Sequence, residues 1–230
     1  MFSPTPFELE ALYLSLKVAF WSVLITLPLG LLFAWILARK RFYGHALLNG
    51  IVHLPLVLPP VVIGFFLLSL LKRHGPVGAF LHDVFGLSVA FTWQGAAIAS
   101  AVMAFPLMVR AIRLSMENVD TGLEAAARTL GASPFRVFYS ITLPLISPGI
   151  LAGIILAFAR SLGEFGATIT FVSNIPGETR TLPLAIFSLL QTPSGDAGAL
   201  RLVVLSIILA LAALLISEYL AVRAKRRIGG

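Results

Sequence analysis

An arginine and a glutamate lie four residues apart inside one of the most apolar stretches of the sequence, in the run RSLGEFGAT. Ionisable side chains at membrane depth are costly, and they usually face a partner charge or a water-filled path. On a helix, the four-residue spacing puts Arg160 and Glu164 on one face, where they can pair. The residues alone leave two interpretations open: a structural ion pair, or one wall of a translocation path.

Small and hydroxyl-bearing residues follow in the same run. Gly163 and Gly166 allow close packing or a break in the helix. An anion that crosses here needs hydrogen-bond donors and positive potential but no deep charge trap, because it must also leave. The candidates for the translocation path are Arg160, Ser161, Gly163, Glu164, Gly166, Thr168 and Thr170.

A polar stretch, residues 113–143, separates two apolar segments, and from Glu124 it reads EAAARTLGASPFRVFYSITLP. Thr121 and Glu124 have the spacing of a capping box, so we expect a helix to begin near Thr121. Apolar residues recur at i, i+4 and i+7 from Leu123, which gives this helix a narrow apolar stripe.

A glycine corner and a second short helix are expected next. Gly131 stands where a left-handed C-terminal cap prefers glycine. Ser133 and Pro134 supply a second start signal, a cap residue followed by proline at the first helical position. We expect this second helix to end before Pro144. The two helices would present one apolar edge for a partner protein; an ordinary loop between two spans is the alternative.

No enzymatic motif accompanies these segments. The sequence lacks HExxH, GxSxG and the Gly-rich Walker phosphate loop. It has no cysteine, which excludes disulfides and thiolate metal sites. We therefore expect no catalytic residue, no metal ligand and no cofactor in this chain, and any ATP-driven work would need a partner ATPase. An intramembrane enzyme is the alternative from another class.

The composition is that of an integral membrane protein. Of 230 residues, 58% are hydrophobic and 12% are charged, and the mean hydropathy is +0.96; a soluble domain carries about 25% charge. The net charge of +7 is gathered beside apolar segments, where topology and lipid headgroups account for it without nucleic acid. We expect one all-α helix bundle, residues 1–230, embedded in the lipid bilayer.

Five apolar segments are long enough to cross a bilayer, which takes about 20 residues. The expected spans are residues 11–38, 47–71, 93–112, 144–172 and 198–222. Because of Pro55, Pro59 and Pro60, the second span cannot be a regular helix throughout. Two further apolar patches, at 77–85 and 182–190, are too short to span.

The distribution of lysine and arginine predicts the orientation. One face carries Arg39, Lys40, Arg41, Arg110, Arg113, Arg128, Arg136, Arg223, Lys225, Arg226 and Arg227. The other face carries Lys72, Arg73, Arg180 and Arg201. The richer face marks the cytoplasm, so five spans place the N-terminus outside and both the polar stretch and the C-terminus inside.

The polar stretch resembles the EAA loop of ABC-importer permeases. A glycine, nine further residues and an I-x-L-P ending reproduce the pattern of that loop, and the acidic residue lies one place before the usual Glu-Ala-Ala. The resemblance implies a type I ABC-importer permease fold and a loop whose helices sit in a cleft of a cytoplasmic ATPase. The implied ATPase-coupling residues are Glu124, Ala125, Ala126, Ala127, Gly131, Ile141, Leu143 and Pro144.

Three longer runs resemble the permeases of molybdate ABC importers: HLPLVLPPVVIGFFLL, FPLMVRAIRLSMENVD and the stretch from Arg160 to Pro193, which contains NIPGETRTLP. Sulfate and tungstate permeases are close relatives, so these substrates remain alternatives, as does a scaffold subunit without an open path. The resemblance implies a homodimer in the bacterial cytoplasmic (inner) membrane. It also implies a cytoplasmic ABC ATPase dimer and a periplasmic oxyanion-binding protein as partners.

Overall fold

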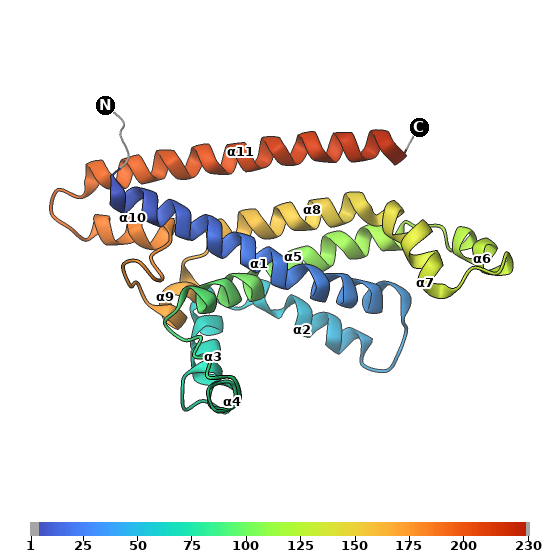
Figure 1. The fold of residues 1–230 in the computed structure, drawn as a ribbon, viewed down its shortest axis with the longest axis horizontal. Helices are drawn as coiled ribbons and strands as arrows, with labels where there is room; N and C mark the ends of the chain where they lie inside the picture. The colour runs from blue at the N-terminus through green and yellow to red at the C-terminus, as the bar shows by residue number, and fades with distance from the viewer. Residues whose placement is uncertain (1–4, 229–230) are drawn as a thin grey trace.

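The computed structural model describes residues 5–228, so the first four and last two residues of the expected single domain lie outside it. Within the described residues the chain is helical and has no strand (Figure 1). The elements are α1 (Pro6–Arg39), α2 (His45–Val57), α3 (Pro60–Leu71), α4 (Pro76–Phe85), α5 (Trp93–Glu117), α6 (Thr121–Thr129), α7 (Pro134–Val137), the π-helix η1 (Phe138–Thr142), α8 (Leu143–Leu162), α9 (Gly166–Val172), α10 (Leu182–Leu190) and α11 (Asp196–Ile228).

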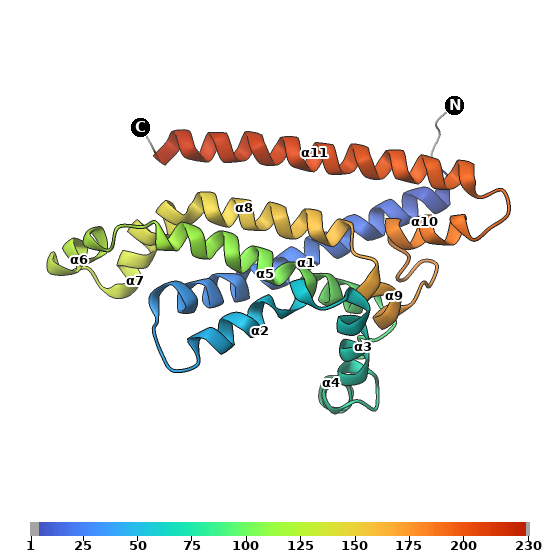
Figure 2. The same cartoon turned by 180° about the vertical axis from the view of Figure 1, so that it is seen from behind.

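Helices α1, α5 and α8 form the centre of the molecule, and α11 runs along α8 (Figures 1 and 2). α1 and α8 approach α5 closely because glycines face it. A Cβ on Gly30 of α1 would lie 2.6 Å from Met108, and one on Gly153 of α8 would lie 2.9 Å from the same side chain. Met108 and Ile112 are fully buried and fill the core between the three helices.

The second expected span is a broken helix, as its prolines predict. α2 and α3 meet at 111° across Leu58 and Pro59. Pro60 begins α3, where its missing N–H costs no helical hydrogen bond. The bend turns α3 aside from the bundle (Figure 1) and lays it against α9, where Gly166 leaves room for Pro60.

In the described part of the chain, four helical stretches are long and apolar enough to cross a membrane, and counting the bent α2–α3 pair gives five. The long stretches are α1, α5, Pro134–Leu162 and α11 as far as Leu215. This agrees with the expected all-α bundle of about five spans. The fourth span differs from the expected 144–172, because the helix breaks after Leu162 and α9 follows as a separate element.

The molecule has two distinct ends along its long axis. α6 and α7 project at one end, where α11 also finishes, whereas α10 and the start of α1 lie at the other end (Figures 1 and 2). The short helices α4 and α10 coincide with the two apolar patches that are too short to span. The polar stretch therefore extends from the end of the bundle opposite to the start of α1.

Candidate functional site

Helix α6 carries the first part of the polar stretch. Its N-cap is Asp120, whose carboxylate accepts a hydrogen bond from the N–H of Gly122 at 2.8 Å. The predicted capping box of Thr121 and Glu124 is therefore wrong: Thr121 is already the first helical residue, and the Glu124 side chain turns elsewhere. The helix nevertheless begins where the sequence predicts, because aspartate caps as well as threonine does.

Gly131 forms the corner after α6. Its φ of +84° lies in the left-handed region, which glycine enters without steric penalty. Its N–H donates to the carbonyl of Arg128 at 3.0 Å and helps to close the helix. Ser133 then caps α7 by accepting from the N–H of Arg136 at 3.3 Å, and Pro134 follows at the first helical position. The corner and the second helix start thus have the predicted form.

The second helix of the stretch does not end before Pro144, contrary to the prediction. It passes through the π turn of η1 and continues into α8. The N–H of Leu143 donates to the carbonyl of Phe138, five residues back. This wider turn accommodates Pro144, which has no N–H and whose ring clashes with a regular α-helical turn. A continuous helical stretch therefore joins the polar stretch to the membrane helix.

Glu124 connects three elements. Its Oε1 lies 2.9 Å from Nη2 of Arg39, at the end of α1, and accepts a hydrogen bond from the Thr142 hydroxyl of η1 at 2.8 Å. The side chains of Arg39 and Glu124 are only 17% and 14% exposed, so water screens this ion pair less than a surface pair. The carboxylate thus ties α6 to both α1 and η1.

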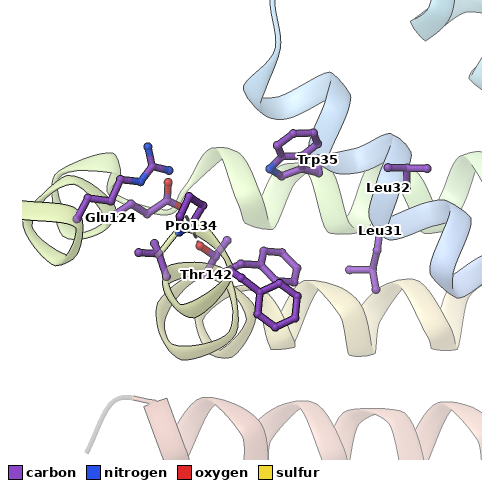
Figure 3. Close-up of a pocket in the computed structure, with 10 residues that line it drawn as sticks. Leu31, Leu32, Trp35, Glu124, Pro134 and Thr142 are labelled. Carbon is purple, nitrogen blue, oxygen red and sulfur yellow. Dashed lines mark hydrogen bonds between the residues drawn. The ribbon is translucent and has the colours of Figure 1, made fainter. Parts of the chain in front are cut away.

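A pocket of about 550 Å³ opens beside this ion pair. Figure 3 shows Glu124, Pro134 and Thr142 along one side of it and Trp35, with its α1 neighbours, along the other. The pocket is largely apolar apart from Glu124, Arg128 and Thr142. It separates the short helices from the end of α1 except where the carboxylate bridges them.

An apolar edge of the polar stretch is uncovered. Leu130 is 88% exposed and Phe135 is 72% exposed, and Leu123 and Tyr139 are about half exposed. The other residues predicted to couple to an ATPase are exposed or partly buried: Ala125, Ala126, Ala127, Gly131, Ile141, Leu143 and Pro144. Apolar side chains gathered on a projecting loop indicate an interaction surface.

Arg160 and Glu164 pair although a helix end lies between them. α8 ends at Leu162, so the predicted placement of the two charges on one helical face is wrong. Nη1 of Arg160 nevertheless lies 2.6 Å from Oε2 of Glu164, an ion-pair contact that lacks hydrogen-bond alignment. Oε1 of Glu164 accepts from the N–H of Ala167 at 2.8 Å. The buried carboxylate thus holds the start of α9 to the end of α8.

The hydroxyls predicted to line a path bond to the protein itself. Ser161 lies 2.7 Å from the hydroxyl of Ser22 on α1. Thr168 and Thr170 donate to backbone carbonyls at the start of α9, at 2.8 and 2.9 Å. Gly163 is exposed, and no atom lies within 4 Å of the place where its Cβ would stand. The segment is therefore a fixed junction between helices, with an open surface at the glycine.

The fold is that of type I ABC-importer permeases. A chain of a bacterial ABC transporter involved in the import of the acidic polysaccharide alginate superposes with a TM-score of 0.75 at 19% identity, covering 95% of this chain and 80% of that one. A chain of the MetNI methionine ABC transporter superposes with a TM-score of 0.68 at 17% identity, covering 95% and 94%. At such identities the likeness shows the fold alone.

The sequence decides the family. Residues 26–226 match the family described as binding-protein-dependent transport system inner membrane component. The chain belongs to this family. The permease is 61% identical over 222 residues to the molybdenum transport system permease protein ModB of Escherichia coli (strain K12), covering 96% of this chain and 97% of that protein.

Two further relatives are less similar to this chain. ModB of Haemophilus influenzae is 59% identical to the permease, covering 96% of this chain and 97% of that protein. The sulfate transport system permease protein CysT of Salmonella typhimurium is 39% identical, covering 89% of this chain and 74% of that protein. Membership of the family makes this chain a multi-pass inner-membrane pore subunit, whose ATP hydrolysis is done by a partner ATPase.

The partners of the functional side chains in this permease could not be predicted from the sequence. Arg39 is part of a basic run that indicates only topology, and no sequence pattern marks Thr142 or Ser22. Arg39 lies 85 residues from Glu124 and Ser22 lies 139 residues from Ser161, whereas Thr142 is 18 residues from Glu124. Among the described residues, no three His, Asp or Glu side chains gather in a group that could hold a metal ion.

Proposed function

We propose that this permease is the transmembrane subunit of an ATP-driven ABC importer that carries molybdate across the cytoplasmic membrane. The observation that carries the proposal is the 61% identity to a molybdenum permease over almost the full length of both chains. The sulfate permease is much less similar, at 39%. Sulfate and tungstate are the alternative substrates, because the resemblance of this chain extends to the permeases of these oxyanions.

The polar stretch would couple the permease to its ATPase. The exposed edge around Leu130 and Phe135 offers the apolar surface on which an ATPase cleft can close. Pro134–Leu162 is one continuous helical stretch, so a push on α7 moves α8 directly. A push on α6 reaches α1 through the contact of Glu124 with Arg39. In this proposal Gly131 sets the angle between the two short helices.

The working complex would contain two copies of this permease, a cytoplasmic ATPase dimer and a periplasmic oxyanion-binding protein. One chain carries one coupling loop, whereas the two ATP sites of an ABC ATPase dimer need two. The loaded binding protein docks outside, ATP closes the ATPase dimer, and both coupling loops move together. The bundle then turns from inward-facing to outward-facing, and hydrolysis resets it.

The proposed orientation places the N-terminus outside and the C-terminus in the cytoplasm. The loop and the finish of α11 lie at the same end of the molecule (Figure 1), which supports this arrangement. The junction of Arg160, Glu164 and Gly163 then lies in the outer half of the membrane. There its ion pair fixes α8 and α9 beside the path, and the open surface at Gly163 borders the path.

Uptake of radiolabelled molybdate tests the proposal. Cells that lack the gene are compared with cells in which it is restored, with unlabelled tungstate or sulfate as competitors. We expect uptake to return with the gene and to persist in a large excess of sulfate. Equal competition by sulfate would replace the substrate but keep the importer, and no return of uptake would overturn the transport function.

A further inference from the structure

A basic pocket lies between the cytoplasmic halves of α2 and α5, apart from the short helices α6 and α7 and from the Arg160 junction. Its volume is about 280 Å³. It is lined by Asn49 and His53 of α2 and by Arg110, Arg113, Leu114 and Glu117 of α5. Two guanidinium groups face one carboxylate here, which leaves the pocket with a net positive charge.

Arg113 is held in place while keeping donors to spare. Its Nε–H donates to Glu117 at 2.7 Å, and its Nη1 donates to the side-chain oxygen of Asn49 at 2.9 Å. A guanidinium carries five N–H donors, and these contacts with described residues use two of them. Arg110 is exposed and forms no ion pair with any described residue. The pocket therefore combines an oriented guanidinium with an accessible one.

The pocket lies on the same face of α5 as residues that are buried further along this helix. Ala96, Met103, Arg110 and Glu117 are seven residues apart and so form one stripe along α5. Ala96 and Met103 are buried in the cluster that includes Phe171 of α9. Arg110 and Glu117 are exposed. The same face of α5 is thus buried in its outer half and exposed at its cytoplasmic end.

We propose that this pocket binds a tetrahedral oxyanion at the cytoplasmic end of the translocation path, with molybdate as its ligand in transport. The proposal rests on the proposed function and deepens it. Planar guanidinium groups bind oxyanions by charge and paired hydrogen bonds. The pocket also has room for several waters of about 30 Å³ each beside the ion.

The pocket is built for weak binding. Glu117 repels an anion and occupies part of the Arg113 guanidinium, so the ion is attracted without being trapped, as a transport path requires. The phosphate of a lipid headgroup has the same tetrahedral oxyanion chemistry. The experiment must therefore separate the transported ion from anionic lipid.

The absence of cysteine from the chain provides the probe. Leu114→Cys places one thiol on the pocket wall, at a side chain that is 54% exposed. Tyr43→Cys is the matched control: Tyr43 is fully exposed, and it lies two residues after the basic run Arg39–Arg41, outside the pocket. The full-length permease, in nanodiscs of phosphatidylcholine alone, is treated with a negatively or a positively charged methanethiosulfonate reagent, with and without molybdate.

At Leu114→Cys we expect the negatively charged reagent to react about 25 times faster than the positively charged one, because one unit of positive charge at about 4 Å in water speeds the first and slows the second by about fivefold each. Molybdate should slow that reaction at Leu114→Cys but not at Tyr43→Cys. Adding Arg110→Gln should remove both effects, and Arg110→Lys should restore the charge preference. Glu117→Gln should lower the molybdate concentration that gives half protection, which means tighter binding. General damage to the fold does not tighten binding.

Two outcomes would overturn the pocket site: equal charge preference and equal protection at both cysteines, or protection that appears only when anionic phosphatidylglycerol is added. Uptake by cells carrying the unmodified gene reports separately on the proposed function. If molybdate uptake returns while Leu114→Cys shows no protection, the pocket site alone fails. If uptake does not return, the transport function fails whatever the labelling shows.

Discussion

Glu124 links the proposed coupling loop to α1 through Arg39 and to η1 through Thr142. Glu124→Gln keeps an acceptor for Thr142 but loses the charge that attracts Arg39. A hydrogen bond to a charged group contributes about 1.5–3 kcal/mol. We expect molybdate uptake to fall by about tenfold, with a normal amount of protein in the membrane, because part of the ATPase movement no longer reaches α1. Initial uptake rates, normalised to a quantitative blot, measure this.

Two controls show whether the loss of uptake comes from the contact between Arg39 and Glu124. Asp83→Asn removes an exposed carboxylate from α4, far from the loop in the fold, and should leave uptake unchanged. Arg39→Gln combined with Glu124→Gln should lose little more than either single variant, because both remove the same contact. Fully additive losses would mean that Arg39 and Glu124 act independently, and the proposed link between α6 and α1 would then be abandoned.

The corner at Gly131 allows backbone strain to be tested without steric clash. Its φ is +84°, but no atom lies within 4 Å of where a Cβ would stand. Asparagine tolerates this region and valine does not, since left-handed backbone costs about 1–2 kcal/mol for L-residues with a Cβ. Gly131→Asn should keep most of the uptake, whereas Gly131→Val should lose most of it while remaining in the membrane. Equal uptake by the two variants would contradict the corner's role.

At the scale of elements, the contact of α3 with α9 determines how the broken span packs over α5. A Cβ on Gly64 would lie 2.5 Å from the backbone oxygen of Ala167, and neither backbone can give way locally. Gly64→Ala should therefore destabilise the detergent-solubilised permease by about 1–3 kcal/mol, the usual cost of overpacking. Gly50→Ala lies in α2 with open space around it and should be neutral or stabilising by up to about 1 kcal/mol.

Thermal unfolding of the two alanine variants measures this difference, and molybdate uptake shows its functional consequence. The same substitution is made in the same broken span, so helix propensity cannot explain a difference in sign. A Gly64→Ala variant as stable as Gly50→Ala would mean that α3 and α9 can separate freely. The burial of the outer half of the α5 face would then need another explanation.

The elements that the sequence predicts well are those governed by local interactions. The glycine corner, the Ser133–Pro134 helix start and the broken second span depend on residues within a few positions of one another. The π turn before Pro144 was not predicted, and the break after Leu162 was only one of two options that Gly163 and Gly166 left open, because both features depend on how α7 and α9 pack against other elements. The Arg39–Glu124 contact joins residues 85 apart, and no local pattern carries that information.

At the scale of the whole molecule, an ion pair ties the bundle together at each end. Near the start of α1, the buried carboxylate of Glu8 accepts from Arg201 of α11 at 2.8 Å and also completes the cap of α1 with Thr5. At the opposite end, Arg39 of the same helix meets Glu124. α1 is therefore anchored to α11 at one end and to the coupling loop at the other, so a movement of the loop acts on a helix whose far end is held.

This arrangement works only if the two ends of α1 lie on opposite sides of the membrane. His74→Cys, in the exposed connection after α3, should react with a membrane-impermeant maleimide in intact spheroplasts. Tyr43→Cys, between α1 and α2, should react only after permeabilisation. A fluorescent protein fused after residue 230 should fold and fluoresce, since it would stay in the cytoplasm. The reverse labelling pattern would turn the coupling loop outward, where no ATPase could reach it, and the basic pocket would then open to the periplasm.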